Sequence, residues 1–318
     1  YISMKTLRLV FLLAMPILLW TNSIATPTNY GYRHIMGSAQ QNEQGAKKGL
    51  QTDSAKIEQL LSSLIPLRSE LKKEDLIIKV ARIFIGTPYV AHTLDRNNEE
   101  TLVVNMRGMD CTTYIENTIA VLLCVDKKQS SFAYFKQMLQ YIRYRKGQLS
   151  YENRLHYYEW WVTDNQQKGI LRQIETPNPP FTATQTLKIN YMSENYNSYY
   201  MLRNKPERVA ALKKIEDQTN GTKVQYIPKS QLNNTELLRK VVRNGDIIAI
   251  TTRKYNLDTT HLGFAVWHNN GLYMLNASSL KRNGRQVVEP KETLYQYLMQ
   301  QPNSTGIRLA RLILPNIR

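Results

Sequence analysis

Apolar side chains recur at helical spacing through the first two thirds of the chain. Ile115, Ile119, Leu122 and Leu123 fall at i, i+4, i+7 and i+8, which predicts one face of a buried helix that starts near residue 111. The same period predicts further helices over residues 54–71, 74–84, 131–145 and 205–216.

The final third changes to the period of β-strands. Residues 247–252 are rich in β-branched side chains, and residues 261–268 alternate large and small positions. The turn sequence at 269–271 predicts a hairpin that returns through 272–276, and 307–314 is expected to close the sheet. Helices followed by antiparallel strands predict an α+β fold.

The N-terminus has the pattern of a secretory signal. Met4 is the expected true start, two basic residues follow it, and residues 9–20 form an apolar stretch that is short for a membrane span. Small residues at 23–25 offer a cleavage site, so we expect export to the periplasm or cell envelope without a stable membrane anchor; an uncleaved anchor is the alternative. The expected organisation is a signal peptide over 1–25, a polar linker over 26–52 and one domain over 53–318.

The composition is that of a globular protein, with 42% hydrophobic and 21% charged residues. A formal net charge of +17 favours an anionic partner, and for an exported protein an anionic cell envelope is the expected one. No nucleic-acid-binding motif is visible, so no nucleic-acid partner is expected. An equally good interpretation is that the charge serves solubility alone.

The chain has two cysteines, Cys111 and Cys124. On one helix they would lie roughly 20 Å apart at about 1.5 Å per residue, whereas a disulfide needs Cα atoms within about 7 Å. They therefore cannot pair with each other. Cys124 falls in the apolar part of the helix and is expected in the core.

Cys111 has the setting of a nucleophile. It follows Asp110, a good N-cap, so it is expected at the first helical position. Unpaired N–H groups and the positive end of the helix dipole favour a thiolate there, and we expect a lowered pKa for the Cys111 thiol.

A catalytic cysteine needs an imidazole, and of five histidines His261 is the preferred candidate. It opens a predicted strand on the face that has the small residues Gly263 and Ala265. A two-residue hairpin turn would place Asn276 on the same sheet face, where it could orient the imidazole. Ser278 has the same parity and is the alternative third member.

Metal and cofactor chemistry is not indicated. The sequence has no Cys/His cluster at the spacing of metal ligands, so we expect no metal site and no cofactor.

Taken together, five short motifs resemble the NlpC-type cell-wall cysteine peptidases, papain-like α+β enzymes that cut peptide bonds in bacterial peptidoglycan. The resemblance covers roughly residues 74–125 and 240–314. In chain order the motifs are Gly86-Thr87-Pro88-Tyr89-Val90, Asp110-Cys111, Gly245-Asp246-Ile247, His261-Leu262-Gly263 and Asn276-Ala277-Ser278.

The resemblance implies a role for each matched residue. Cys111 would be the nucleophile at the N-terminus of a buried helix packed on an antiparallel sheet, His261 the base and Asn276 the orienting residue. Tyr89 would lie near the oxyanion. Asp110 matches an aspartate that holds a free amine of the substrate in this family, although it could instead only cap its own helix.

The chain departs from the family pattern in three respects. The family usually has glycines after the Tyr-Val pair, whereas residues 91–93 are Ala-His-Thr here. The third member is commonly histidine rather than asparagine, and a large insertion, about 126–240, separates the cysteine from the histidine. Within it, residues 153–160 resemble a signature of an N-acetylmuramoyl-L-alanine amidase-like subgroup. This block makes Arg154, His156 and Tyr157 candidates for substrate binding.

The resulting hypothesis is an exported amidohydrolase that acts on peptidoglycan or muropeptide fragments. It would cleave the N-acetylmuramoyl-L-alanine amide bond through a cysteine acyl-enzyme. The alternative within the class is an endopeptidase for the γ-D-glutamyl–diamino-acid bond of the stem peptide. The alternative from another class is a non-catalytic envelope-binding module.

Overall fold

A computed structural model describes residues 53–317; the predicted signal peptide and linker lie outside the described residues. A first helix covers residues 53–64. The later α-helices are α2 (Leu67–Glu70), α3 (Lys73–Ile83), α4 (Cys111–Asp126), α5 (Phe132–Arg143), α6 (Tyr158–Gln167), α7 (Tyr191–Glu194), α8 (Pro206–Thr219), α9 (Thr235–Arg239) and α10 (Leu294–Met299). In the described part, no helix combines the length and apolar character needed to cross a membrane.

The strands form one antiparallel sheet in the order β2-β3-β8-β4-β5-β6-β7, and β1 also pairs with β8. The strands are β1 (Leu171–Ile174), β2 (Ala183–Thr186), β3 (Lys223–Pro228), β4 (Ile247–Thr252), β5 (Thr259–His268), β6 (Gly271–Ala277), β7 (Val287–Val288) and β8 (Ser304–Leu312). The described chain is therefore an α+β protein with an antiparallel sheet. The hairpin predicted at 269–271 joins β5 to β6, with His268 paired to Gly271.

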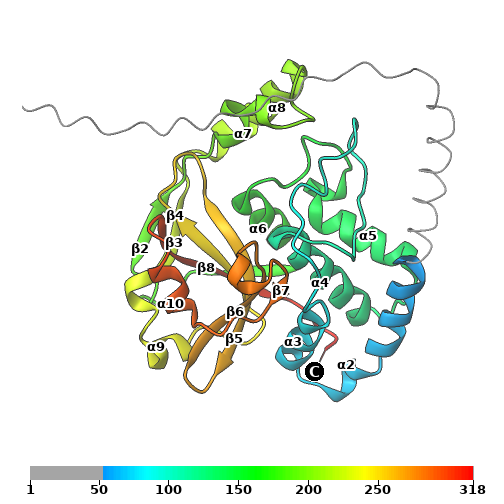
Figure 1. The fold of residues 1–318 in the computed structure, drawn as a ribbon, viewed down its shortest axis with the longest axis vertical. Coiled ribbons are helices and arrows are strands. Elements are labelled where there is room, and N and C mark those ends of the chain that lie inside the picture. The colour runs from blue at the N-terminus through cyan, green and yellow to red at the C-terminus, as the bar shows by residue number, and fades with distance from the viewer. Residues whose placement is uncertain (1–52, 318) are drawn as a thin grey trace, which may run out of the picture. The chain divides into compact units, whose positions relative to one another are not determined.

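Both faces of the central sheet are covered. In β4, Ile247 and Ala249 belong to the core cluster shared with α4, whereas Ile248 and Ile250 belong to a second cluster shared with α9 and α10. Figure 1 shows α3, α4 and α5 on one side of the sheet and α9 and α10 on the other. Burial on both faces explains why residues 247–250 form a continuous apolar stretch rather than an alternating one.

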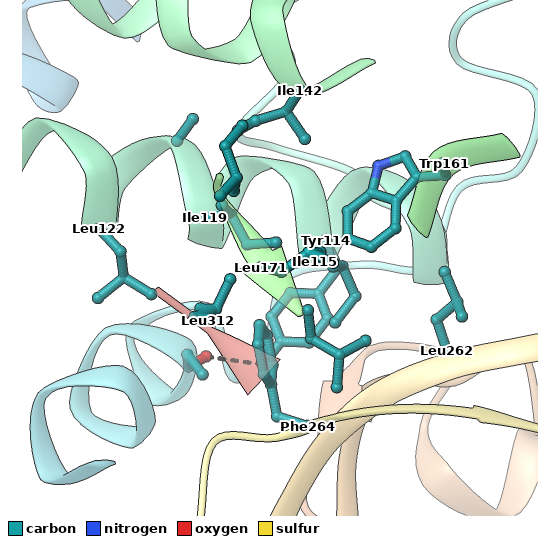
Figure 2. Packing of buried hydrophobic residues seen from close by; sticks show 14 of the residues in the cluster. Tyr114, Ile115, Ile119, Leu122, Ile142, Trp161, Leu171, Leu262, Phe264 and Leu312 are labelled. Carbon is teal, nitrogen blue, oxygen red and sulfur yellow. Dashed lines mark hydrogen bonds between the residues drawn. The ribbon is translucent and has the colours of Figure 1, made fainter. Parts of the chain in front are cut away.

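Helix α4 is the centre of the larger core, and 14 of its 16 residues are buried. Its side chains pack between the sheet and the neighbouring helices, as Figure 2 shows for Tyr114, Ile115 and Ile119. The Tyr114 ring meets Phe264 of β5 edge-on at 5.7 Å between centroids, and its hydroxyl donates to the Ala81 carbonyl at 3.0 Å. These contacts fix the start of α4 against β5.

A buried ion pair holds the chain segment that leads to α4. The Arg143 Nε atom lies 2.7 Å from Glu116 Oε2, and Nη1 of the same guanidinium donates to the Val103 carbonyl at 2.7 Å. Both side chains are 2% exposed, so removal of one partner would leave an uncompensated buried charge.

The structure differs from the predicted elements in two places. The predicted helix over 54–71 is interrupted, because Pro66 stands at the N-cap of α2 and separates it from the helix over 53–64. The insertion also contributes strands to the sheet that the sequence did not predict. Leu171 of β1 pairs with Leu312, and Ile227 of β3 pairs with Ile307, so the insertion is built into the same sheet.

Candidate active site

Helix α4 begins at Cys111, and Asp110 caps it. The Asp110 Oδ1 atom accepts a hydrogen bond from the Thr113 N–H at 2.8 Å, and the Thr113 hydroxyl accepts from the Asp110 N–H at 3.0 Å. This reciprocal capping box is the arrangement that places an N-cap residue immediately before the first helical turn. Of the two roles considered for Asp110, the structure therefore shows helix capping.

The thiol of Cys111 lies half-buried in the wall of a cavity of about 220 Å³, which His261 and Leu262 also line. Burial and the neighbouring Asp110 carboxylate raise the pKa of Cys111 to about 12, although hydrogen bonds from the Leu262 and Thr112 backbone oppose part of the rise. The prediction of a lowered pKa for Cys111 is therefore wrong. Removing a thiolate from water beside a carboxylate outweighs the helix N-terminus.

His261, at the start of β5, is oriented by Asn276 on β6. Its Nε2 atom lies 2.9 Å from Asn276 Oδ1, and the Asn276 amide donates to the Met274 carbonyl at 2.8 Å, which fixes the direction of the amide group. Since Oδ1 can only accept, Nε2 carries the proton and Nδ1 keeps its lone pair. Burial lowers the pKa of His261 despite the opposing effects of Asn276 and Asp110, so the neutral imidazole is favoured.

Ser278, the alternative partner for His261, makes different contacts. Its hydroxyl accepts from the Leu280 N–H at 3.3 Å and from the Asn283 side-chain amide at 3.0 Å. The hydroxyl thus stabilises the loop after β6.

Tyr89 lies close to the cysteine. Its N–H donates to the Arg285 carbonyl at 2.8 Å, and the next residue, Val90, donates to the Met109 carbonyl at 3.0 Å. Burial and the nearby charges of Cys111 and Asp110 raise the pKa of Tyr89 to about 12, so its hydroxyl stays protonated and able to donate.

The cavity beside Cys111 is lined mainly by the insertion. Its walls include several tyrosines and the indole of Trp161. The Nε1 atom of Trp161, the hydroxyl of Tyr158 and the Nε atom of Arg154 are buried there without a hydrogen-bond partner in the described structure, and each residue is at most 5% exposed. Because buried polar groups are normally paired, these three atoms are available to a water molecule or to a polar ligand that reaches them.

Arg154, His156 and Tyr157 all line this cavity, together with Cys111 and His261. The guanidinium of Arg154 is largely occupied: Nη2 bonds to Asp95, and Nη1 donates to the Leu94 carbonyl at 3.2 Å. Both terminal nitrogens of Arg154 are therefore tied to the 94–95 segment, and Nε has no hydrogen-bond partner in the described structure.

His156 and Tyr157, the other two predicted side chains, differ in the polar atoms that remain free to bind a ligand. His156 Nε2 lies 2.8 Å from the Tyr151 carbonyl, and burial holds the His156 pKa well below its ordinary value, so Nδ1 remains an acceptor. The Tyr157 hydroxyl donates to Glu216 at 2.7 Å and accepts from the Met192 N–H at 2.9 Å. The Tyr157 ring forms part of the cavity wall, while its hydroxyl is fully engaged in hydrogen bonds within the protein.

Tyr158 and Trp161 were not singled out among the aromatic residues of the insertion, and Asp258 was not predicted as a site residue. The two Asp258 carboxylate oxygens accept from the Glu159 and Thr259 N–H groups, both at 2.7 Å, and so join the first turn of α6 to β5. Asp258 thereby fixes the aromatic wall relative to His261. The density of aromatic residues around 157–161 was the available signal, but it does not say which side chains face a cavity.

A family model described as AmiA-like, N-acetylmuramoyl-L-alanine amidase-like, matches residues 79–307. A crystal structure of an N-acetylmuramoyl-L-alanine amidase from Bacteroides uniformis is 37% identical with a TM-score of 0.68, covering 74% of this chain and 97% of that one. No curated protein matches the chain.

Two further structures are similar. A Bacteroides fragilis protein with a provisional xylanase label is 36% identical, with a TM-score of 0.68 over 74% of this chain and 99% of that one. The Legionella pneumophila protein LPG0564 is 24% identical, with a TM-score of 0.58 over 82% of this chain and 97% of that one. The second likeness concerns the fold alone.

Proposed function

Because the chain belongs to the N-acetylmuramoyl-L-alanine amidase-like family, we propose that it hydrolyses the amide bond between N-acetylmuramic acid and L-alanine in peptidoglycan fragments. The observation that supports this most directly is one cavity that holds Cys111, His261 and unpartnered polar groups of the insertion together. We include in the proposal a papain-like arrangement of these residues and export to the periplasm or cell envelope.

The proposed reaction starts from a neutral pair. The Cys111 pKa is raised and the His261 pKa is lowered, so the resting pair is neutral, and His261 Nδ1 takes the thiol proton only as Cys111 Sγ attacks the amide carbonyl. The C–N bond then breaks, and His261 returns the proton to the leaving nitrogen. A water molecule, deprotonated by His261, attacks the thioester; the C–S bond breaks and the thiol regains its proton.

Two donors are available for the oxyanion that forms on the carbonyl oxygen. The Cys111 N–H is at the first position of α4, where a helix leaves its N–H groups unpaired. The Tyr89 hydroxyl is the second, since its raised pKa keeps it protonated beside Cys111. Such preorganised donors stabilise the charge that develops in the transition state.

The proposed sugar site is the cavity lined by the insertion. Its aromatic rings suit the C–H faces of a pyranose, and the Trp161 and Tyr158 donors suit hydroxyl, acetamido or lactyl oxygens. An endopeptidase acting within the stem peptide would need a site for a free ammonium and would use few of the aromatic groups of the insertion; Asp110, the candidate for that ammonium, has Oδ1 engaged in capping α4. These contacts favour the muramoyl substrate.

Mass spectrometry of a purified N-acetylmuramoyl tetrapeptide after incubation tests the proposal. We expect free N-acetylmuramic acid and the intact tetrapeptide. A muramoyl dipeptide with a released diamino-acid peptide would establish the endopeptidase instead. A folded enzyme that leaves the compound unchanged, with Cys111→Ala giving the same trace, would favour the non-catalytic alternative.

A further inference from the structure

His261 lines two cavities. The first is the cavity with Cys111 described above. The second is a groove of about 450 Å³, which we call the β-edge groove; His261 lines it together with Lys254, Ser278, Ser279, Tyr297 and Asn303. Cys111 lines the first cavity but not the β-edge groove.

The proposed reaction assigns a different part of the substrate to each of these two cavities. The carbonyl carbon must meet the Cys111 sulfur, so the acyl part of the substrate belongs in the cavity with Cys111. The leaving nitrogen must receive a proton from His261, so the group attached to that nitrogen continues past the imidazole. The β-edge groove is the second space that His261 lines, and Cys111 does not line it.

The side chains of the β-edge groove suit an anionic peptide. Hydroxyl and amide groups from Ser279, Asn303 and their neighbours can bond to peptide N–H and C=O groups. Of the described residues that line it, Lys254 is the one lysine or arginine, and none is an aspartate or glutamate. Lys254 is exposed and forms no ion pair within residues 53–317.

We propose that the β-edge groove binds the leaving peptide and that Lys254 recognises one of its carboxylates. The inference rests on the proposed function. In a stem peptide the carboxylate has two sources, the α-carboxylate of a γ-linked D-glutamate and the C-terminal carboxylate. The two sources share one chemistry and differ in their distance from the scissile bond.

The test compares three synthetic substrates: N-acetylmuramoyl-L-Ala-γ-D-Glu-L-Lys, its glutamate α-carboxamide and its C-terminal carboxamide. We expect Lys254→Met to raise KM for the first compound by about fivefold at low ionic strength, with a smaller effect in high salt. Lys254→Arg should retain most of the affinity. Lys79→Met, which removes an exposed charge on α3 away from both cavities, is the matched control.

The carboxamides identify the carboxylate. Wild-type KM should rise for the compound that lacks the recognised group, and for that compound Lys254→Met should have no further effect. An equal effect of Lys254→Met on all three substrates, or no effect on any, overturns the inference.

Calorimetric binding of the tripeptide L-Ala-γ-D-Glu-L-Lys to Cys111→Ala tests the groove without hydrolysis. We expect binding that weakens with Lys254→Met and is unchanged by Lys79→Met. If the wild type leaves the muramoyl bond intact while this dependence persists, the proposed function fails and the peptide site stands. Binding that is absent, or indifferent to Lys254, overturns the peptide site.

Discussion

The hydrogen bond from His261 Nε2 to Asn276 Oδ1, 2.9 Å long, runs diagonally between β5 and β6. Phe264 pairs with Leu275, and this antiparallel register continues to Gly263 facing Asn276. A Cβ at position 263 would lie 3.1 Å from the Asn276 Cβ and 2.8 Å from the Leu275 carbonyl oxygen. The absence of a side chain at Gly263 therefore lets Asn276 reach the histidine two residues away.

Gly263→Ala should disturb this relationship. The new methyl group would also lie 2.5 Å from Met274 Cγ, so the strands must shift, and we expect a loss of about 1–3 kcal/mol in the free energy of unfolding. kcat should fall more than KM changes, because the imidazole loses its orientation. Chemical denaturation and steady-state kinetics measure the two effects; unchanged kcat in a destabilised protein would contradict the positioning role of Gly263.

Asn276→Ala should lower kcat by roughly 10- to 100-fold, since a misoriented imidazole still works part of the time. Ser278→Ala is the matched control, because the Ser278 hydroxyl bonds to the following loop rather than to His261. We expect a change of less than about threefold for Ser278→Ala in the same kinetic assay. A larger loss for Ser278→Ala than for Asn276→Ala would mean that the third member has been wrongly assigned.

Cys111→Ala should reduce turnover by at least about a thousandfold, because the acyl-enzyme can no longer form. Cys124→Ala offers the comparison within the same helix: Cys124 is fully buried in the core, so we expect lower thermal stability with normal turnover. Product release and thermal denaturation are measured on both variants. Near-normal turnover in folded Cys111→Ala would exclude the proposed mechanism.

The pH dependence should reflect a neutral cysteine–histidine pair. The His261 pKa lies below its ordinary value of 6.5, so we expect kcat/KM to hold from neutral pH to below 6.5 before it declines. Below pH 6.5 this histidine takes up a proton in the unfolded chain that the buried imidazole does not take up. The His261 contribution therefore lowers the free energy of unfolding as pH falls below 6.5 and leaves it unchanged above that pH.

Because burial raises the Cys111 pKa, alkylation by iodoacetamide should be slow at pH 6 and increase into the alkaline range. Rapid alkylation of Cys111 at pH 5, with Cys111→Ala as the blank, would indicate a resting thiolate.

Trp161→Phe tests the unpartnered donors of the cavity. The change removes an indole N–H that makes no hydrogen bond in the described structure and keeps an aromatic ring, so the free energy of unfolding should fall by less than about 1.5 kcal/mol. KM for a muramoyl substrate should rise by about tenfold, corresponding to one lost hydrogen bond of about 1.4 kcal/mol. Calorimetric unfolding and kinetics on the same preparation separate the effects. An unchanged KM would mean that Trp161 does not contact the substrate.

Local patterns in the sequence were sufficient for the central elements. The helix from Cys111, its Asp110 cap, the strand at 247–252 and the hairpin at 269–271 each depend on residues close together in the chain, and the structure has all four. The parity that a two-residue turn sets placed Asn276 and Ser278 on the face of His261, and only the structure shows that Asn276 makes the hydrogen bond. The sequence by itself thus determined the local elements that hold Cys111, His261 and Asn276.

Only the tertiary structure decided the chemistry around them. The raised pKa of Cys111 comes from burial by segments far along the chain, and a helix-start motif contains no information about that burial. The joining of β1 and β3 to β8 and the link from Asp258 to α6 likewise depend on contacts between distant residues. Helical period and capping determine short-range geometry. Desolvation, the shape of the cavity and the hydrogen bonds that occupy Arg154 and Tyr157 depend instead on the distant groups that the fold brings into contact with them.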